Sequence, residues 1–205
     1  MKLINLFILI LLAAEVSSAH PVIYKGGILY ESESTGKRSD ILLGYSFHQQ
    51  WSLAGQYINE NETRTEYQFF RLNHRLYRQN NIDSQFNVYL SAGLGFEKVS
   101  DQKKNAALYE VITDWEDRDY YTSASYRLID RKNDQDEKQY KVRAGLAPYR
   151  GEFDSLNLWF ITEFRKQEYE NWQTTPLIRM FYKTVLTEFG ISLNGESQFT
   201  IMFHL

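Results

Sequence analysis

The side chains best suited to acid–base chemistry near neutral pH are the four histidines, because imidazole titrates in that range. They are scattered along the sequence, at His20, His48, His74 and His204. His48 falls in a predicted turn, His204 is one residue from the last position, and no serine lies near His74 in the sequence. A hydrolase needs a nucleophile, a base and an orienting group, and no such constellation is recognisable. The sequence therefore favours a protein without enzymatic activity.

Metal-binding patterns are equally weak. The chain has no cysteine and no pair of histidines at ligand spacing. The acidic stretch DRKNDQDEK at 130–138 superficially resembles a calcium-binding loop, but it lacks the central glycine and the distant glutamate of such loops. Mixed-charge runs of this kind are usually solvated surface loops. We therefore expect no metal site and no cofactor.

A larger set of charged residues shares a regular spacing. Each of them lies in a segment where apolar and polar side chains alternate, and each falls on the polar side of the alternation. If the apolar side faces lipid, these charges must face inward, because a charge on the lipid side costs about 2–4 kcal/mol near the bilayer midplane. The predicted lumen-lining residues are Arg71, Arg75, Glu110, Asp114, Arg127, Lys141, Arg143, Glu163, Arg165, Arg179 and Glu188, with Lys183, Tyr89 and Tyr121 beside them.

Two interpretations of this set remain open. The excess of basic residues in it would make an open pore favour anions. Alternatively, charges of both signs pair with one another, and the barrel is narrow or closed. Twelve strands lie between the eight that leave room only for side chains and the sixteen that leave an aqueous channel.

Alternation is the dominant signal along the whole chain. It is cleanest in SQFNVYLSAGLGFE (84–97), where one face is aliphatic with a phenylalanine at each end. That is the profile of a strand that crosses a bilayer between two aromatic rings. Further strands are predicted at 22–31, 40–48, 51–57, 65–77, 105–115, 118–128, 139–147, 154–164, 171–182, 184–193 and 197–205. We expect a bulge at the glycine pair of the first and another near Phe69 and Phe70.

The connections between these strands alternate in character. Charged stretches such as ESTGKRS and NENETR are predicted to be outer loops, whereas HQQ, EDR and KT are predicted to be tight periplasmic turns. Both termini then lie on the periplasmic side, and the short turn NGE breaks the pattern. Membrane barrels of this type have an even number of strands. The sequence predicts an all-β, antiparallel up-and-down barrel of twelve strands, or of ten if two candidates are loops.

The N-terminal segment has the composition of a secretory signal. Lys2 precedes an apolar run, and small residues follow at Ser17, Ser18 and Ala19. The run is too short for a transmembrane anchor, which needs about 20 residues. We therefore expect a signal peptide at 1–19 and a single barrel domain at 20–205, with His20 as the first residue of the mature chain.

Composition supports the same class of protein. Aromatic residues make up 16% of the chain, with 15 Tyr and 13 Phe, as is typical of membrane barrels with aromatic girdles. The net charge of −3 argues against a nucleic-acid partner. A protein without disulfides must be stabilised by core packing or by the membrane.

The last strand, SQFTIMFHL, has an apolar face that would meet lipid while its edge pairs with the first strand. It is similar to the C-terminal segments that the barrel-assembly machinery recognises, although Leu205 replaces the usual terminal aromatic residue. The alternative is a soluble periplasmic, lipocalin-like barrel that binds a small ligand between its apolar faces. The aromatic ends of the apolar faces favour lipid.

Four stretches carry a narrower resemblance: IYKGG (23–27), DWEDRDYYTS (114–123), LAPYRGEFDSLNLWF (146–160) and the segment 175–205. They are similar to segments of a family of small, functionally uncharacterised proteobacterial outer-membrane β-barrel proteins. The resemblance implies the fold and a location in the bacterial outer membrane, but no established activity. We expect a narrow small-solute pore or a structural envelope protein, in contact with outer-membrane lipid and lipopolysaccharide.

Overall fold

The computed structural model describes residues 20–132, 135–152, 154–168 and 170–205, and the expected signal segment lies outside them. Within these residues the chain is all-β. Its strands are β1 (Ile28–Thr35), β2 (Arg38–His48), β3 (Trp51–Glu60), β4 (Thr65–Asn80), β5 (Ser84–Val99), β6 (Gln102–Asp117), β7 (Tyr120–Arg131), β8 (Glu137–Leu146), β9 (Asn157–Gln167), β10 (Gln173–Tyr182), β11 (Val185–Ile191) and β12 (Ser197–His204). No helix among the described residues is long and apolar enough to cross a membrane.

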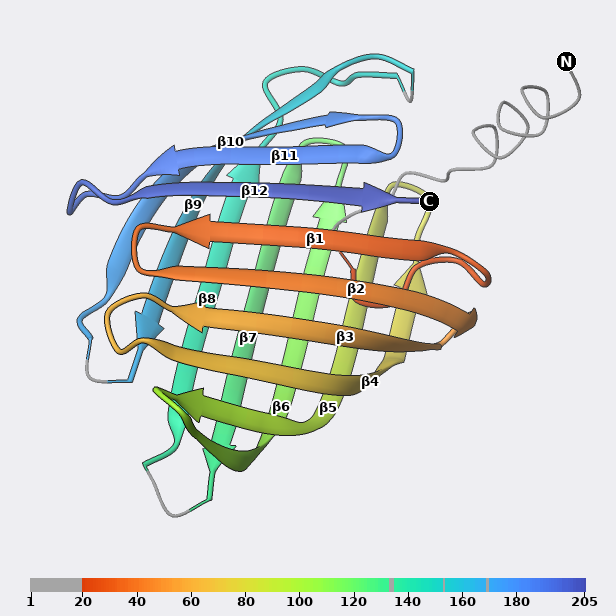
Figure 1. The fold of residues 1–205 in the computed structure, drawn as a ribbon. Helices are drawn as coiled ribbons and strands as arrows, with labels where there is room; N and C mark the ends of the chain where they lie inside the picture. Colours follow the sequence, from red (N-terminus) through yellow and green to blue (C-terminus); the bar gives the residue numbers. More distant parts are fainter. Residues whose placement is uncertain (1–19, 133–134, 153, 169) are drawn as a thin grey trace, which may run out of the picture.

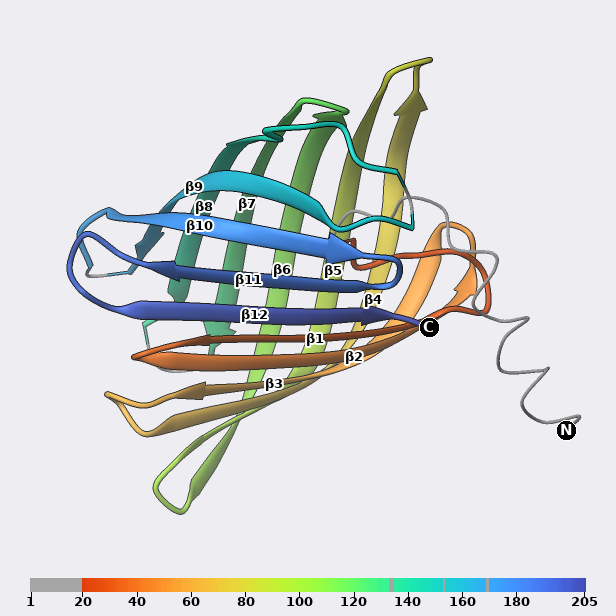
Figure 2. The ribbon, with the colours of Figure 1, turned by 90° about the horizontal axis from the view of Figure 1, so that it is seen from above.

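The strands form one closed barrel in which each pairs antiparallel with its neighbours in sequence. The seam is closed by β1 and β12, where Leu29 faces His204 and Thr35 faces Gln198. Figure 1 shows β12 beside β1, and Figure 2 shows the same closure from above. Closure leaves no unpaired strand edge, the condition for a sheet to span hydrocarbon. The predicted twelve-stranded up-and-down barrel is confirmed, and the ten-stranded alternative is wrong.

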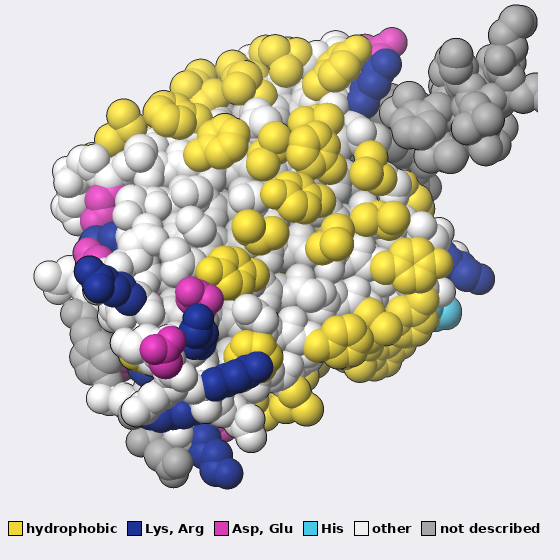
Figure 3. Space-filling view, in the orientation of Figure 1, with side chains coloured by type: hydrophobic (Ala, Val, Ile, Leu, Met, Phe, Trp, Pro, Cys, Tyr) yellow, Lys and Arg dark blue, Asp and Glu magenta, His cyan; other side chains and the backbone are white. Residues whose placement is uncertain are grey.

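Apolar side chains point outward and polar ones inward, because successive residues of a strand face opposite sides of the sheet. On β5, Leu90 and Leu94 are exposed, whereas Tyr89 and Ser91 are buried inside the barrel. Figure 3 shows hydrophobic side chains spread over the outer wall, with charges gathered mainly towards one rim. This orientation is the reverse of a lipocalin-like barrel, whose apolar faces line the cavity.

The two rims of the barrel are distinguished by the chain ends. At the terminal end the chain enters β1 and leaves β12, and the connections there are 49–50, 81–83, 118–119, 147–156 and 183–184. At the far end the connections are 36–37, 61–64, 100–101, 132–136, 168–172 and 192–196. The predicted tight turns HQQ, EDR and KT are confirmed as two-residue connections at 49–50, 118–119 and 183–184. The prediction of long outer loops is wrong, because strands absorb most of the charged stretches and leave connections of two to five residues at the far end. The longest connection, 147–156, lies at the terminal end.

The first strand begins later than predicted. Residues 22–27 precede β1, and the glycine pair makes a turn rather than a bulge: Gly26 has φ of 87°, a conformation that glycine adopts without a steric penalty. Its amide donates to the carbonyl of Ser46 at 2.6 Å. β1 continues to Thr35 and β2 begins at Arg38. The stretch ESTGKRS, predicted to be an outer loop, therefore forms the ends of two strands and the two-residue turn between them.

The bulge expected at Phe69–Phe70 lies further along β4. Phe69 is buried and Phe70 is exposed, in regular alternation, and the register shifts only between Arg75 and Tyr77. The extra residue, Leu76, leaves two consecutive apolar side chains facing outward.

The inner wall is layered along the barrel axis. On β3 the inward side chains follow the order Ser52, Ala54, Gln56 and Ile58 from the terminal end to the far end. Ala54 belongs to an apolar cluster with Ile23, Leu29, Leu42, Phe181, Leu186 and Met202. Ile58 belongs to another, with Tyr67, Phe69, Ala106, Leu108 and Ile129. Between the two clusters lies a layer of charged and amide side chains.

Candidate functional site in the barrel lumen

We call this middle layer the ion-pair layer. It consists of Glu33, Asp40, Gln56, Arg71, Glu110, Arg127, Lys141, Arg143, Glu163, Arg165, Arg179 and Glu188. All these residues occupy inward positions of their strands, so the same alternation that exposes an apolar belt concentrates charge in the lumen.

One half of the layer is centred on Glu110 of β6. Its carboxylate is 2.6 Å from Nη2 of Arg71 and 2.8 Å from Nε of Arg127. Arg71 also donates to Oε1 of Gln56 at 2.6 Å. Arg71 fits here because Gly93 lies opposite it on β5, where a Cβ atom would come within 3.1 Å of the Arg71 Cβ. Each charge in this half is therefore held by more than one bond.

The other half is centred on two glutamates. Glu163 of β9 is fully buried and lies 2.6 Å from Arg143 and 2.8 Å from Arg165. Glu188 of β11 lies 2.7 Å from Arg179 and 3.2 Å from Arg143. Arg143 thus links the two carboxylates. Buried charges are tolerated only when they are paired and hydrogen-bonded, as these are.

Some pairs of the layer cross the lumen. Asp40 on β2 and Arg127 on β7 are 2.7 Å apart, although β3 to β6 separate their strands along one side of the ring. Glu33 on β1 lies 2.8 Å from Lys141 on β8, with β9 to β12 between them on the other side, and also pairs with Arg165. These pairs join nearly opposite walls and narrow the middle of the barrel.

The space that remains is divided along the axis. The central cavity, beside the crossing pairs, has a volume of about 110 Å³. That is room for roughly three or four water molecules. A vestibule of about 490 Å³ opens at the far end, and a cavity of about 560 Å³ lies at the terminal end. The lumen is thus two wide mouths around a constriction.

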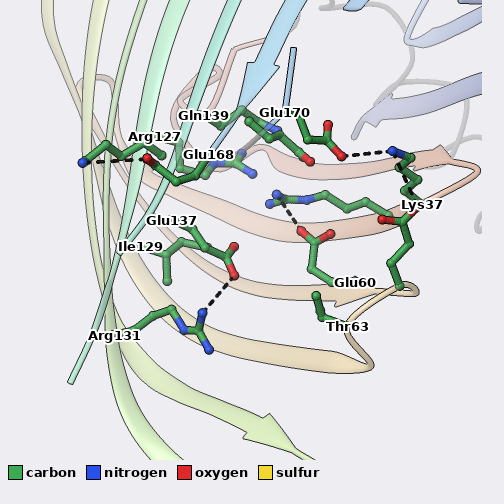
Figure 4. A pocket seen from close by; sticks show the side chains of 14 residues that line it. Lys37, Glu60, Thr63, Arg127, Ile129, Arg131, Glu137, Gln139, Glu168 and Glu170 are labelled. Atoms are coloured by element: carbon green, nitrogen blue, oxygen red, sulfur yellow. Dashed lines mark hydrogen bonds and ion pairs between the residues drawn. The ribbon is translucent and has the colours of Figure 1, made fainter. Parts of the chain in front are cut away.

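The vestibule at the far end is lined by charges of both signs (Figure 4). Arg38 lies 2.9 Å from Glu60, and Arg131 lies 3.7 Å from Glu137. Lys37, in the β1–β2 turn, is within 3.5 Å of carboxylates from three other turns; they belong to Glu62, Glu170 and Glu196. The vestibule charges therefore neutralise one another at the rim.

The pKa values of Lys37, Asp119 and Arg150, which form ion pairs in the turns, are shifted. The hydrogen bond from Lys37 to Glu170, reinforced by the neighbouring carboxylates, raises the pKa of the Lys37 ammonium group. At the terminal end, the hydrogen bonds from Arg150 lower the pKa of the Asp119 carboxyl group, and the pKa of Arg150 is raised in return. The second pair fastens the connection 147–156 to the turn 118–119.

The structure places most of the predicted lumen residues in the ion-pair layer. They are Arg71, Glu110, Arg127, Lys141, Arg143, Glu163, Arg165, Arg179 and Glu188. Asp114 and Arg75 face inward nearer the terminal end, with Arg75 opposite Tyr89. The Cζ atom of Arg179 lies 4.4 Å from the centroid of the Tyr121 ring, in a cation–π contact. Lys183 lies in the β10–β11 turn with φ of 54°, not on the inner face of a strand.

Sequence reasoning missed Glu31, Glu33 and Asp40. The sequence does not reveal them because glutamates alternate with serines in ESES, so no apolar face marks this part of the first hairpin as a strand. With them, five acidic side chains line the central cavity, namely Glu31, Glu33, Asp40, Glu110 and Asp114, against four basic ones, namely Arg71, Arg127, Lys141 and Arg143. The expected basic excess is not found there, so the lining of this cavity gives no support to the predicted anion preference.

His20 and His204 are both buried inside the barrel, whereas His48 and His74 are not. His74 is on the outer face, stacked on Trp51 with ring centroids 3.9 Å apart. His204 is buried beside Met202, and His48 ends β2. His20 is inside the barrel, 3.3 Å from Asp114. Among the described residues, no group of three or more histidine, cysteine or acidic side chains is arranged to hold a metal ion.

Comparisons with known proteins bear on the fold. No protein-family model matches the chain, and no curated protein matches it in sequence. A solved structure described as "KdgM porin in complex with disordered oligogalacturonate" aligns with a TM-score of 0.52 and 12% identity, covering 87% of this chain and 97% of that one. A second KdgM porin structure aligns with a TM-score of 0.51, the same identity and the same coverages.

The fold is that of an outer-membrane β-barrel. At 12% identity the likeness extends to the fold alone. The narrower resemblance to a proteobacterial family gains no sequence support from these comparisons and stays a prediction.

Proposed function

We propose that this chain resides in a bacterial outer membrane and forms a narrow passage for small solutes. The observation that carries the proposal is the combination of an apolar outer wall with a charged lumen. Soluble monomers rarely expose apolar patches beyond about 300–600 Å². Here exposed large apolar side chains occur on strand after strand, for example Leu43, Phe70, Leu94, Tyr120 and Phe189.

Strand length also supports a barrel wall that spans a membrane. Nine strands, β2 to β10, have 10 to 16 residues, whereas β1, β11 and β12 have 7 or 8. A tilted strand needs about 9–11 residues to cross a bilayer. The likeness to a porin barrel supports the passage, and the constriction limits it to solutes small enough to move between paired charges. No catalytic step is part of the proposal.

The partners follow from this placement. Outer-membrane lipid covers the belt, and the far-end rim, with its charges of both signs, faces lipopolysaccharide. The barrel-assembly machinery recognises β12 during insertion.

This placement puts the far end of the barrel outside the cell. An epitope inserted at 61–64 should bind antibody on intact cells, whereas the same epitope at 118–119 should need permeabilised cells; the opposite result would contradict the orientation.

A second candidate function rests on the crossing ion pairs. Pairs that join opposite walls brace a barrel, and a braced, electrically silent barrel would be a structural envelope protein. The two candidates share the fold and location and differ only in permeability.

The test has two stages. Outer-membrane fractions are first run on gels in mild detergent, boiled and unboiled, where a faster unboiled band marks a folded membrane barrel. Recovery in the soluble periplasm without that shift would contradict the proposed location. The purified barrel is then reconstituted in a planar bilayer. Small, discrete conductance steps would support a passage, and silence under all voltages would favour the structural role.

A further inference from the structure

The residues just before β1 lie inside the barrel. His20 and Ile23 are 4% and 6% exposed, and Val22 is fully buried. Beyond them the backbone turns at Gly26, whose positive φ allows the chain to reverse and enter the wall as β1. Tyr24, between the buried stretch and this turn, is 42% exposed.

The inner wall holds this segment by specific contacts. The hydroxyl of Ser52 donates to the carbonyl of Pro21 at 2.7 Å, and the amide of Ile23 donates to the hydroxyl of Ser46 at 3.1 Å. Ile23 joins the apolar cluster at the terminal end. Gly27 makes room for it, because a Cβ at Gly27 would lie 2.6 Å from the Ile23 side chain.

The first residue of the segment contacts two further strands, β5 and β6. The His20 ring lies 5.0 Å from the Tyr89 ring on β5, and its Nδ1 is 3.3 Å from the Asp114 carboxylate on β6. Asp114 is itself held by Asn87 at 2.7 Å. The segment therefore lies inside the barrel and contacts the inner wall from β2 and β3 to β5 and β6.

Its position places it in the path of any solute. Pro21 lines the central cavity together with Arg71 and Glu110 of the ion-pair layer. A solute that has passed the crossing pairs from the far end meets Pro21 next. The obstruction is independent of the ion pairs, because it is made by a short segment that the barrel wall does not include.

We propose that residues 20–23 are a releasable plug that closes the lumen on the terminal side of the ion-pair layer. The proposal rests on the proposed passage function. If the signal peptide is removed after Ala19, the plug has a free end at His20 and a hinge at Gly26. It can then leave the lumen without breaking a strand pairing. It is held by a few hydrogen bonds, the contact between His20 and Asp114, and one apolar side chain in the terminal-end cluster. Such segments open locally far more easily than the barrel unfolds.

The first experiment measures whether the segment is packed in the lumen, and it needs no conductance. The chain has no cysteine, so a single introduced thiol reports its own surroundings. Val22→Cys in the folded, detergent-solubilised barrel should react with a water-soluble thiol reagent at least about tenfold more slowly than Tyr24→Cys, because it must wait for local opening. Equal rates would overturn the plug.

The second experiment measures whether the plug controls passage. Val22→Asp places a charge where the wall offers burial, which should expel the segment, and Tyr24→Asp makes the same change at an exposed position. Both variants must first show the gel shift of a folded barrel. We expect Val22→Asp to raise the single-channel conductance several-fold above wild type, with Tyr24→Asp unchanged.

The outcomes separate this inference from the proposed function. A folded Val22→Asp barrel that conducts no better than wild type would overturn the plug as a gate. If Val22→Asp fails to fold, a Ser52→Ala, Ile23→Ser variant replaces it with the same expected rise. Absence of the gel shift in wild type would refute the membrane barrel, whereas slow labelling of Val22→Cys would still support the packed segment.

Discussion

The ion-pair layer and the far-end vestibule use the same residue types with different consequences. In the layer, the side chains of Glu163 and Glu188 are at most 1% exposed, and each meets two guanidinium groups. In the vestibule, the side chain of Lys37 is 34% exposed, and its partner Glu62 is 63% exposed. Water screens the charges of the vestibule, but it does not screen the buried charges of the ion-pair layer.

The difference shows that position, not residue type, decides what a charge does in this barrel. A buried pair leaves an uncompensated charge when one partner is lost, at a cost of about 3–5 kcal/mol, whereas exposed pairs contribute about 0–1 kcal/mol. The layer therefore sets the rigidity and the bore of the lumen. The vestibule pairs are expected to contribute little to stability.

The largest expected effect comes from removing a charge at the centre of the layer. Glu163→Gln leaves Arg143 and Arg165 short of a counter-ion, and we expect the free energy of unfolding to fall by about 3–5 kcal/mol. The matched control is Glu168→Gln, because Glu168 lies in the β9–β10 turn at the far end and pairs with Lys138 at 3.7 Å, with its side chain 26% exposed. Urea unfolding in detergent, followed by tryptophan fluorescence, measures both. Equal losses would erase the distinction between layer and vestibule.

A crossing pair can be removed as a unit. The double variant Asp40→Asn, Arg127→Gln removes both charges, and Glu110 keeps Arg71 as its partner. Because neither Asp40 nor Arg127 is then left without the other, stability should change by less than the sum of the two single variants. We expect a coupling energy of about 0.5–3 kcal/mol between the two sites. Single-channel conductance should rise, because the brace across the lumen is lost. Unchanged conductance, with a measurable coupling energy, would mean that this pair does not limit passage.

The vestibule should respond weakly and in a salt-dependent way. Lys37→Gln should lower the free energy of unfolding by no more than about 1 kcal/mol, and less at high salt, because its pairs are exposed. The folded-state pKa of Lys37 is raised, so its contribution is complete below the ordinary pKa of lysine and is lost as pH rises through the raised value. Unfolding of wild type and variant should therefore differ at neutral pH and converge only in strong alkali.

The smallest effect is expected at the exposed pair between Asp119 and Arg150. The pKa of Asp119 is lowered, so the pair is present above the ordinary pKa of aspartate and is lost as pH falls through the lowered value. Asp119→Asn should leave global unfolding unchanged and loosen only the connection 147–156. Limited proteolysis of that connection should be faster in the variant at neutral pH and equal to wild type in acid. A shift in global unfolding would contradict a purely local role.

Much of the barrel could be predicted because each strand carries its own signal. The alternation in 84–97 identifies a strand and separates Leu90 from Tyr89 by local sequence alone. The bounds of the first hairpin could not be predicted, because Glu31 and Glu33 alternate with serines and no apolar face marks this part of the strand. The sequence predicts the bulge at Phe69–Phe70 instead of Leu76 because both places have two adjacent apolar residues. The sequence alone does not show which pair interrupts the alternation.

The sequence by itself determined the strands, their even number and the inward side of most charges, because these depend on the period of a strand and on the cost of exposing charge to lipid. Only the tertiary structure decided which charges meet. Asp40 and Arg127 are far apart in sequence, and their pairing depends on the closure and tilt of the whole ring. The position of residues 20–23 was likewise invisible in the sequence, because four residues carry no periodicity and are held only by walls that distant strands provide.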